Sequence, residues 1–440
     1  MNICVIGTGY VGLVTGAGLA ELGNRVICQD VNKEKIAHLK EGKTPFYEKG
    51  LKDLIKKNQK AKRLSFTTHL TEAVYPSNII FIAVGTPARE SGEADLSFVI
   101  KVAEDLLPLI NEYKIIAIKS TVPVGTFELI TEILEKEGKR KGVDFDIAST
   151  PEFLREGNAV YDFFHPTRIV VGCDNPKVGE ILHQLFSPLN APILHTTPTT
   201  AQMIKYASNT FLASRISFIN EIANICERMG ADVTEVSRGM SYDKRLGEGY
   251  LNAGIGFGGP CLIKDLKALI KMAENNGYEA GFLKSILQKN EHQTRTILYK
   301  VKQALGGSLY DKTVGILGLS FKAGTSDVRN SLSLRIIELL QKEGAKIKAY
   351  DPQGMEEARR IIPDITFAED PYQAANSDAL LILTCWQEFK ELDLEKIKEN
   401  LKSPIVIDGV NIFNPDVTVS YTHLRAHETP EHLVCRLLLE

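Results

Sequence analysis

The chain has 440 residues, of which 44% are hydrophobic, and its 52 Lys and Arg against 55 Asp and Glu give a net charge of −3. This near balance argues against binding to nucleic acid or to a membrane surface. No apolar run approaches the roughly 20 residues that span a bilayer. Since a domain takes about 150 residues, the length predicts two or three domains. The chain opens on a strand-like run at residues 2–6, so we expect no signal peptide and a cytoplasmic protein.

The seven cysteines form no CxxC pair and have no histidine-rich partner segment. This spacing excludes a zinc ribbon and a disulfide framework. We therefore expect no metal site, and each cysteine is interpreted as buried filler or as a reactive thiol.

Short apolar strands alternate with helices in the first part of the chain. Strands are predicted at 3–6, 25–29, 78–84, 114–119, 144–149 and 168–172, and helices at 13–22, 96–110 and 127–137. This alternation predicts a parallel sheet with crossover helices, in an α/β domain that covers residues 1–198.

Helices dominate the middle of the chain. Residues 201–229 form one helical stretch without Gly or Pro, which predicts a central helical dimerisation domain at 199–305. The opening pattern then returns as a strand at 313–317, a Gly-containing turn, a helix at 333–342 and a strand at 346–351, and it predicts a second α/β domain at 306–419. The predicted fold is therefore two Rossmann-like, doubly wound domains joined by a long central helix.

The last segment, residues 420–440, does not fit this pattern. It carries three of the nine histidines within ten residues, and it lacks a strand or a Gly turn that would complete an α/β unit. We interpret it as an artefact of read-through or frameshift and leave it out of the fold prediction.

A glycine-rich loop at residues 7–12 follows a strand and opens a helix, which is the context that a dinucleotide-binding fingerprint requires. Gly7 allows the tight turn, Gly9 lets the backbone approach the pyrophosphate, and Gly12 permits close packing of helix on strand. Tyr10 and Val11 lie at the helix start, where backbone N–H groups hold phosphates.

The acidic residue of the fingerprint is Asp30, which ends the second predicted strand. Its carboxylate would accept hydrogen bonds from the adenosine ribose and repel a 2′-phosphate, so the pattern favours NAD over NADP. Lys35 could neutralise the adenosine end, although an exposed helix lysine is the simpler interpretation. The segments 84–87 and 120–126, with Thr86 and Thr121, also follow strands and lie where parallel strands meet the ligand.

Four further features suggest chemistry. The segment 151–157 ends a strand and carries Glu152 and Glu156, while Lys205 and Asn209 are four apart in the long helix and so share a face. A glycine-dense loop ends at Cys261, and Lys264 and Asp265 follow it.

Cys261 is the centre of the functional hypothesis. A thiol that enters a helix beside lysines ionises more easily, and a thiolate adds readily to an aldehyde. Together with NAD, this chemistry allows an alcohol to be oxidised to an aldehyde and then, through a thiohemiacetal, to a thioester.

At these residues the sequence closely resembles the UDP-glucose 6-dehydrogenase family of nucleotide-sugar dehydrogenases. The resemblance runs from Met1 to about Pro415 and rests on separated motifs, namely the dinucleotide loop, 119–126, 151–157, 162–172, Lys205 with Asn209, the Cys261 loop, and Phe321-Lys322 with Asp327 and Arg329. The family oxidises UDP-glucose twice with two NAD, and its long helix lies at a dimer interface. A homodimer or larger homo-oligomer is therefore expected.

The resemblance also implies a role for each matching residue. Cys261 is the nucleophile, Lys205 and Asp265 handle protons at the reacting oxygen, Glu152 and Thr121 activate water, and Asn209 belongs to the oxyanion site. The cofactor site takes in Thr86, Glu156 near the nicotinamide and Lys264 near the phosphates. The UDP-glucose pocket is implied to include Phe153, Leu154, Tyr250, Leu251, Asn252, Gly258, Phe321 and Lys322, with Arg245 reaching the partner subunit's substrate.

The second α/β domain lacks a full fingerprint, since Gly315 and Gly318 are followed by Leu-Ser-Phe-Lys. It is a poor dinucleotide site but suits UDP, and the planar fork of Arg329 suits a phosphate, which we assign to the cofactor. The chain has Pro260 where the family usually has Ser, and Val410 where it usually has Arg.

Three alternatives remain open. A sister enzyme would act on a UDP-N-acetylhexosamine or GDP-mannose with the same chemistry. A β-hydroxyacid dehydrogenase would carry out one oxidation and need neither Cys261 nor residues 312–415. A non-enzymatic NAD sensor would have no reason to keep the thiol, the lysine and the two carboxylates together.

Overall fold

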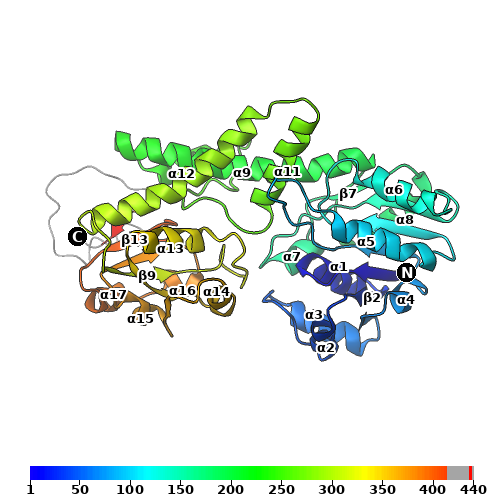
Figure 1. Ribbon diagram of the computed structural model, residues 1–440, viewed down its shortest axis with the longest axis horizontal. Coiled ribbons are helices and arrows are strands. Elements are labelled where there is room, and N and C mark those ends of the chain that lie inside the picture. The colour runs from blue at the N-terminus through cyan, green and yellow to red at the C-terminus, as the bar shows by residue number, and fades with distance from the viewer. Residues whose placement is uncertain (414–435, 439–440) are drawn as a thin grey trace. The chain divides into compact units, whose positions relative to one another are not determined.

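The computed structural model describes residues 1–413 and the backbone of residues 436–438. The chain forms two compact units (Figure 1). Unit 1 contains residues 1–208 and 267–279, and unit 2 contains residues 209–266 and the described residues from 280 onward. Two helices, α9 (Pro198–Met229) and α11 (Leu262–Asn275), therefore have residues in both units.

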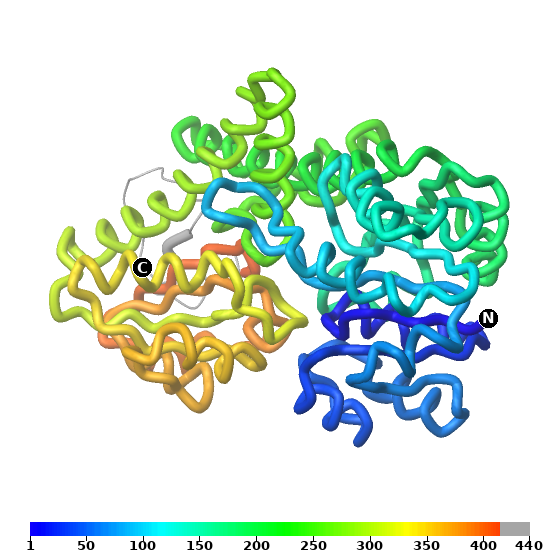
Figure 2. Tube along the Cα trace, turned by 45° about the vertical axis from the view of Figure 1, so that its right-hand side comes forward, coloured from blue at the N-terminus to red at the C-terminus, as the bar shows by residue number. Residues whose placement is uncertain are grey.

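Unit 1 is built on an eight-stranded sheet with the order β3-β2-β1-β4-β5-β6-β7-β8. Its strands are β1 (Asn2–Ile6), β2 (Arg25–Gln29), β3 (Leu64–Thr67), β4 (Ile79–Ile82), β5 (Lys114–Ile118), β6 (Phe145–Ser149), β7 (Ile169–Cys173) and β8 (Ile193–Thr196). Its helices before α9 are α1 (Tyr10–Glu21), α2 (Lys33–Lys40), α3 (Leu51–Lys60), α4 (Leu70–Val74), α5 (Ser97–Leu106), α6 (Thr126–Lys136), α7 (Ala159–Phe164) and α8 (Pro176–Phe186). The blue N-terminal strand runs through the interior of this sheet (Figure 2).

The predicted strands and helices of this unit are all present, but the sheet is not wholly parallel. β7 runs antiparallel to β6, with Ala148 opposite Cys173 and Ser149 opposite Gly172. A buried apolar strand reads the same in either direction, so its sequence does not encode this reversal. Two strands, β3 and the half-exposed edge strand β8, were not predicted from the sequence. Neither has the continuous apolar run by which the other strands are predicted.

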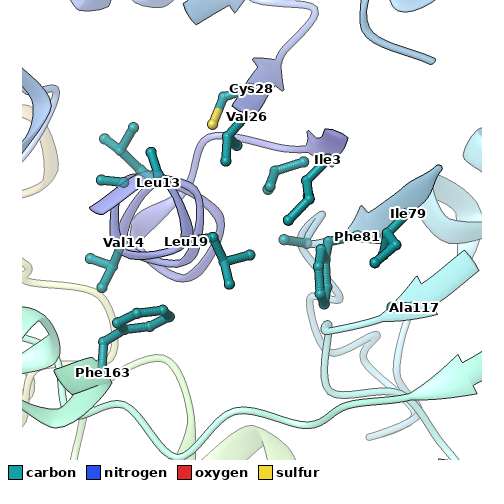
Figure 3. Close-up of a cluster of buried hydrophobic side chains, with 14 of the residues drawn as sticks. Ile3, Leu13, Val14, Leu19, Val26, Cys28, Ile79, Phe81, Ala117 and Phe163 are labelled. Atoms are coloured by element: carbon teal, nitrogen blue, oxygen red, sulfur yellow. The ribbon is translucent and has the colours of Figure 1, made fainter. Parts of the chain in front are cut away.

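Helix α1 is almost entirely apolar and buried, and it packs Leu13, Val14 and Leu19 between the sheet and its neighbours. Figure 3 shows α1 with Val26 and Cys28 of β2 on one side and Phe163 of α7 on the other. A second cluster on the opposite face of the sheet joins β1, β4, β5 and β6 to α5 and α6. Burial on both faces fixes the carboxyl ends of the central strands.

Unit 2 combines the C-terminal part of α9 with α10 (Val233–Ser241), α12 (Gly281–Ala304) and a six-stranded sheet of order β11-β10-β9-β12-β13-β14. The strands are β9 (Thr313–Leu317), β10 (Lys346–Tyr350), β11 (Thr366–Phe367), β12 (Ala379–Ile382), β13 (Val406–Asp408) and β14 (Arg436–Leu438). The other helices are α13 (Leu332–Lys342), α14 (Met355–Ile361), α15 (Pro371–Ala375), α16 (Gln387–Lys390) and α17 (Leu394–Asn400).

The faces of this second sheet are covered differently. Residues of α12 and α13 form one core cluster against β9, β10 and β12, and residues of α15, α16 and α17 form another. Figure 1 shows α13 on one side of β9 and α15 and α17 on the other. The fold prediction for this domain is confirmed, and two α/β sheets flank the central helices along the chain.

One expectation about the end of the chain is wrong. The segment 420–440 was expected to lack a strand, yet Arg436–Leu438 form β14, which pairs antiparallel with β13. A strand of three residues adds backbone hydrogen bonds at a sheet edge without any periodic pattern in the sequence. The rest of this segment, with its interpretation as an artefact, lies outside the described residues. Among the helices of the described chain, none is both long and apolar enough to cross a membrane.

Candidate active site

The loop between β1 and α1 has the geometry of a dinucleotide cradle. Gly7 has a φ of +96°, and a Cβ atom there would lie 2.6 Å from the carbonyl oxygen of Ala83. A Cβ on Gly12 would lie 2.0 Å from the Gly7 oxygen, so the helix can approach the turn only with glycine here. No heavy atom lies within 4 Å of the same point on Gly9, where space for a phosphate is needed. Tyr10 begins α1, and Val11 follows it.

Asp30 lies just after β2 and is anchored to this loop. Its Oδ2 accepts hydrogen bonds from the backbone N–H and hydroxyl of Thr8, at 2.9 and 2.7 Å, and from Lys35 Nζ at 2.9 Å. Among the described residues, its Oδ1 accepts a hydrogen bond from the backbone N–H of Asn32 alone. Burial alone would raise the pKa of Asp30, but the hydrogen bonds from Asn32, Thr8 and Lys35 outweigh burial and hold the pKa below its usual value. The carboxylate is thus charged, with acceptor capacity left for a ribose hydroxyl. The residues present fit NAD.

The equivalent acid of the second sheet is Asp351, and its oxygens are fully used. In both sheets the first glycine of the turn donates to the strand end, Gly7 to Gln29 and Gly318 to Tyr350, each at 2.8 Å. Asp351, however, accepts from six donors, namely the backbones of Leu319, Ser320, Gln353 and Gly354, the Ser320 hydroxyl and the Trp386 indole. A carboxylate has about four lone pairs, so none remains for a ribose.

A first group of candidate residues lies in unit 1 around Glu152, after β6. Glu152 Oε1 accepts from Lys205 Nζ at 3.1 Å, and its Oε2 accepts from the backbone N–H of Leu154 at 2.5 Å. Both members of the ion pair are buried, with side chains only 5–6% exposed. The centre of the Phe153 ring lies 5.5 Å from Lys205 Nζ and 3.8 Å from the Arg168 guanidinium. Removing both charges from water costs desolvation free energy. A buried ion pair of this kind is therefore a candidate for a role in binding or catalysis.

The two turns at the carboxyl ends of β4 and β5 are tied together. Thr86 donates its hydroxyl proton to the carbonyl of Thr121 at 2.8 Å. Both residues therefore lie at the sheet edge on which the dinucleotide loop also opens, as the sequence predicts. Glu156, further along the segment after β6, is buried.

A second group lies in unit 2. Asp265 is completely buried, and its Oδ2 accepts from Asn209 Nδ2 at 2.6 Å. Its other oxygen accepts from Lys264 Nζ, also at 2.6 Å. The ammonium that the resemblance assigns to cofactor phosphates is thus paired with the carboxylate next to it.

Cys261 occupies the position just before α11, and its carbonyl accepts from the Asp265 backbone at 2.9 Å. The thiol is half-buried, in contrast to the fully buried Cys4 and Cys28. For Cys4 and Cys28, burial raises the pKa, to about 12 at Cys28. Cys261 instead lies at the start of a helix, where the helix dipole favours the charged form of a thiol.

The loop that leads to Cys261 is held by three amide side chains that the motifs did not reveal. Asn290 accepts from the Phe257 N–H at 2.8 Å and donates to the Phe257 carbonyl at 2.9 Å. Gly254 is held by Asn220, which accepts from its N–H, and by Gln293, which donates to its carbonyl. These side chains belong to α9 and α12. In the sequence, the sign of such a role is an amide residue at a helix position where the pattern predicts an apolar one.

The glycines of this loop allow contact with the second sheet domain. A Cβ on Gly258 would lie 2.5 Å from the Asn330 carbonyl oxygen. Asn411 donates to the Ala253 carbonyl at 3.0 Å, and Val410, next to it, is half-buried with its N–H bound to Asp408. The structure thus places Val410 on the segment that supports the loop. Pro260 is partly exposed beside the thiol.

The remaining candidates lie in unit 2 and differ in their exposure. Arg245 is exposed and pairs with Asp243, and Arg329 pairs with Asp327 in the same way through Nε at 2.8 Å. Lys322 Nζ lies 5.6 Å from the ring centre of Phe321. Three neighbours complete the set, namely Tyr250 with a φ of +63°, buried Leu251 and exposed Asn252.

Comparison with known proteins identifies the family. Residues 1–190 match its NAD binding domain, residues 199–292 its central domain and residues 315–415 its UDP binding domain. The chain belongs to the UDP-glucose/GDP-mannose dehydrogenase family. The family that the motifs indicate is confirmed, and the chain is an NAD-dependent oxidoreductase, as predicted.

Among its relatives is UDP-glucose 6-dehydrogenase TuaD of Bacillus subtilis, 47% identical over 94% of this chain and 90% of the relative. A solved UDP-glucose dehydrogenase from Pyrobaculum islandicum is 38% identical, with a TM-score of 0.88 over 93% of this chain and 94% of that one. A GDP-mannose dehydrogenase from Pseudomonas aeruginosa is 33% identical, with a TM-score of 0.56 over 94% and 97% of the two chains.

Proposed function

We propose that this dehydrogenase oxidises the C6 hydroxymethyl group of UDP-glucose to a carboxylate with two molecules of NAD⁺, through a covalent intermediate on Cys261. The observation that carries the proposal is the placement of a half-buried thiol at the start of α11, at the end of a loop held by Asn290, Asn220 and Gln293. A structural cysteine needs no such support.

The first oxidation requires removal of the hydroxyl proton at C6. We assign this step to Lys205, whose side chain is buried and paired with Glu152, because a buried lysine is a residue type that can serve as a base. Asp265 and Asn209 form the second polar group, and the amide would donate to the developing oxyanion. Bound NAD⁺ supplies the chemistry of both oxidations, by accepting a hydride in each.

The second oxidation begins with addition of the Cys261 sulfur to the aldehyde carbon, which forms a C–S bond and, after protonation, a thiohemiacetal. Loss of a hydride and of the hydroxyl proton gives a thioester. Water then attacks the thioester carbon, the C–S bond breaks, and the carboxylate and the thiol are released. The balance is UDP-glucose, two NAD⁺ and one water to UDP-glucuronate, two NADH and three protons.

Hydrolysis needs a base for the attacking water, and Glu152 and Thr121 are the groups that we assign to it. One oxygen of Glu152 is fixed by Leu154, so the carboxylate is oriented before the water arrives. Lys205 would stabilise the second oxyanion with Asn209.

The binding residues fall into two sets, one for the cofactor and one for the nucleotide sugar. For the cofactor we assign Gly7, Gly9, Tyr10, Val11, Gly12, Asp30, Lys35, Thr86, Thr121, Glu156, Lys264 and Arg329. For the nucleotide sugar we assign Glu152, Phe153, Leu154, Lys205, Asn209, Arg245, Tyr250, Leu251, Asn252, Gly258, Phe321 and Lys322. The saturated Asp351 supports this division, since the second sheet lacks an acceptor for the ribose of a dinucleotide.

We further propose an NAD-binding domain at 1–198, a dimerisation domain at 199–305 and a UDP-sugar domain at 306–419, in a cytoplasmic homodimer or larger homo-oligomer. UDP-glucose is favoured over GDP-mannose because the chain is more similar to the named UDP-glucose dehydrogenases, at 47% and 38% identity against 33%.

The test is to count NADH formed per sugar consumed by the purified full-length protein, with UDP-glucose, GDP-mannose and UDP-N-acetylhexosamines in parallel. Two NADH per UDP-glucose, with UDP-glucuronate as product, is the expected result. One NADH per sugar indicates a single-step dehydrogenase, turnover of another sugar alone indicates a sister enzyme, and cofactor binding without NADH indicates a sensor.

A further inference from the structure

A second buried lysine, Lys119, lies beside the Glu152–Lys205 pair in unit 1. It directly follows β5, and its N–H donates to the Ile82 carbonyl at 2.8 Å. In the parallel pairing of β5 with β6, Ile118 lies opposite Ser149, and the Thr150 N–H donates to the Ile118 carbonyl at 2.8 Å. Lys119 therefore leaves the sheet at the level where the chain turns into the segment of Glu152.

The surroundings of this lysine differ from those of a structural lysine. Lys119 is 9% exposed, and its Nζ lies 5.5 Å above the ring of Phe186, which also packs edge-on against Phe81. Within the described part of the chain, no acceptor lies at hydrogen-bond distance from this ammonium group. A cation-π contact alone replaces little of the hydration that the ammonium loses.

Lys114, on the same strand, provides the contrast. It is also buried, but its Nζ donates to the carbonyl oxygens of Tyr75 at 3.2 Å and Ser77 at 2.7 Å. These bonds join β5 to the turn before β4, at the other end of the strand. These hydrogen bonds account for the burial of Lys114 as a structural residue. The contacts of Lys119 do not account for its burial in the same way.

The charges that act on Lys119 come from two other elements. Glu152, after β6, attracts it, and Lys205, on α9, repels it. Burial is the largest effect and lowers the pKa of Lys119 to about 8, the repulsion from Lys205 adds to this lowering, and Glu152 opposes both. Two ammonium groups thus lie near one carboxylate, and with both lysines protonated and the carboxylate ionised the three side chains carry a net charge of +1.

We propose that Lys119 is a positioning residue that acts through Lys205: by sharing Glu152, it makes the Lys205 ammonium release its proton more easily and so prepares Lys205 to act as a base. A cationic neighbour is one of the known ways to activate a lysine. This inference deepens the proposed function and rests on it.

The sign of the effect can be stated in advance. Without Lys119, no second ammonium group from β5 opposes the Glu152–Lys205 pair, and Lys205 should hold its proton to higher pH. In Lys119→Met the pH at which kcat/KM for UDP-glucose reaches half of its maximum should rise by about one unit. Lys119→Arg keeps a permanent cation and should leave this midpoint where it is or lower it.

Two measurements separate this role from a merely structural one. The first is the pH profile of kcat/KM, with NAD⁺ affinity measured alongside. The second is a ¹³C NMR titration of lysine Cε in the free protein, with the Lys205 signal assigned by its loss in Lys205→Met. Lys114→Met is the matched control, because it removes a buried lysine from the same strand, and it should lower stability without moving either midpoint.

An upward shift of both midpoints in Lys119→Met, with Lys119→Arg and Lys114→Met unshifted, is the expected result. Unchanged midpoints in Lys119→Met, or an equal shift in Lys114→Met, would overturn the proposal. If Lys119→Met does not fold, Lys119→Gln takes its place. If the wild-type protein forms no NADH from UDP-glucose, the proposed function has failed, and the NMR titration still decides the question for Lys119.

Discussion

Asn290 and Phe257 form a two-way contact, in which one side-chain amide both accepts from the N–H and donates to the carbonyl of the same residue. Phe257 lies four residues before Cys261, and both members of the contact are buried. The helix α12 therefore sets the path of the loop that carries the thiol.

Replacing Asn290 by alanine should change the position of this loop without touching the reacting atoms. Because small displacements of a reacting group are costly, we expect kcat to fall by about tenfold or more. The NAD⁺ dissociation constant, measured by calorimetry, should stay the same. Asn400→Ala serves as control, because this partly exposed amide donates to the Lys396 carbonyl of its own helix, away from the loop. Equal kcat values in wild type and Asn290→Ala would mean that the loop keeps its path without the clamp.

Replacing Cys261 by serine should abolish formation of the acid. A serine hydroxyl beside the same helix start stays protonated and adds poorly to an aldehyde, so the rate of UDP-glucuronate formation should fall by about 10³-fold or more. Product is measured by chromatography. The exposed Cys385, replaced in the same way, should leave the rate unchanged. Acid formation at the wild-type rate in Cys261→Ser rules out covalent catalysis.

The cofactor preference should depend on Asp30. Asp30→Ala removes an acceptor for the ribose and leaves Lys35 without its partner, so the kcat/KM ratio for NAD⁺ over NADP⁺ should fall by about 10- to 100-fold. An added arginine nearby should move the preference further toward NADP⁺. Lys35→Ala keeps the carboxylate and should change the ratio little. A ratio that stays the same in Asp30→Ala shows that this carboxylate does not reach the ribose.

The pH dependence of stability should reveal the bond between Asp162 and Arg155. Burial alone would raise the pKa of Asp162, but the side chain and backbone of Arg155 more than compensate, and the pKa is lowered. This contribution to the free energy of unfolding is therefore complete above the unfolded pKa of about 3.9 and is lost as the pH falls through the lower folded value.

Asp162→Asn should accordingly lower the free energy of unfolding by about 1–2 kcal/mol at pH 7, after allowance for solvent screening. The difference from wild type, measured by urea unfolding, should shrink from pH 7 towards pH 3. Asp174→Asn, which breaks an exposed pair with Lys141, should have almost no effect at either pH. A difference that is constant across this range would contradict the assigned charge.

The sequence was most informative where a local rule and a chemical motif coincide. The loop at Gly7, Gly9 and Gly12 has a backbone path that requires glycine at Gly7 and Gly12. The apolar run before the loop and the helical spacing after it predict the strand and the helix that it joins. The thiol at Cys261 was found because a glycine-dense loop is unusual before a helix.

Other parts of the site depend on contacts between distant segments. Asn290 and Gln293 reach the loop from about thirty to forty residues away, and on α12 they occupy positions that a helical pattern assigns to the core. A buried amide looks the same in sequence whether or not it binds a loop. The reversed direction of β7 and the ion pair of Lys264 with Asp265 are likewise decided by packing.

The donors around Asp351 limit how the second half of this molecule could be redesigned. Both sheets have the same turn, with a glycine and an acid at the same places. In the second sheet the acid is bound to the turn itself, so introducing a dinucleotide site there would require a new turn. Substitutions of surface residues alone would leave this obstacle in place.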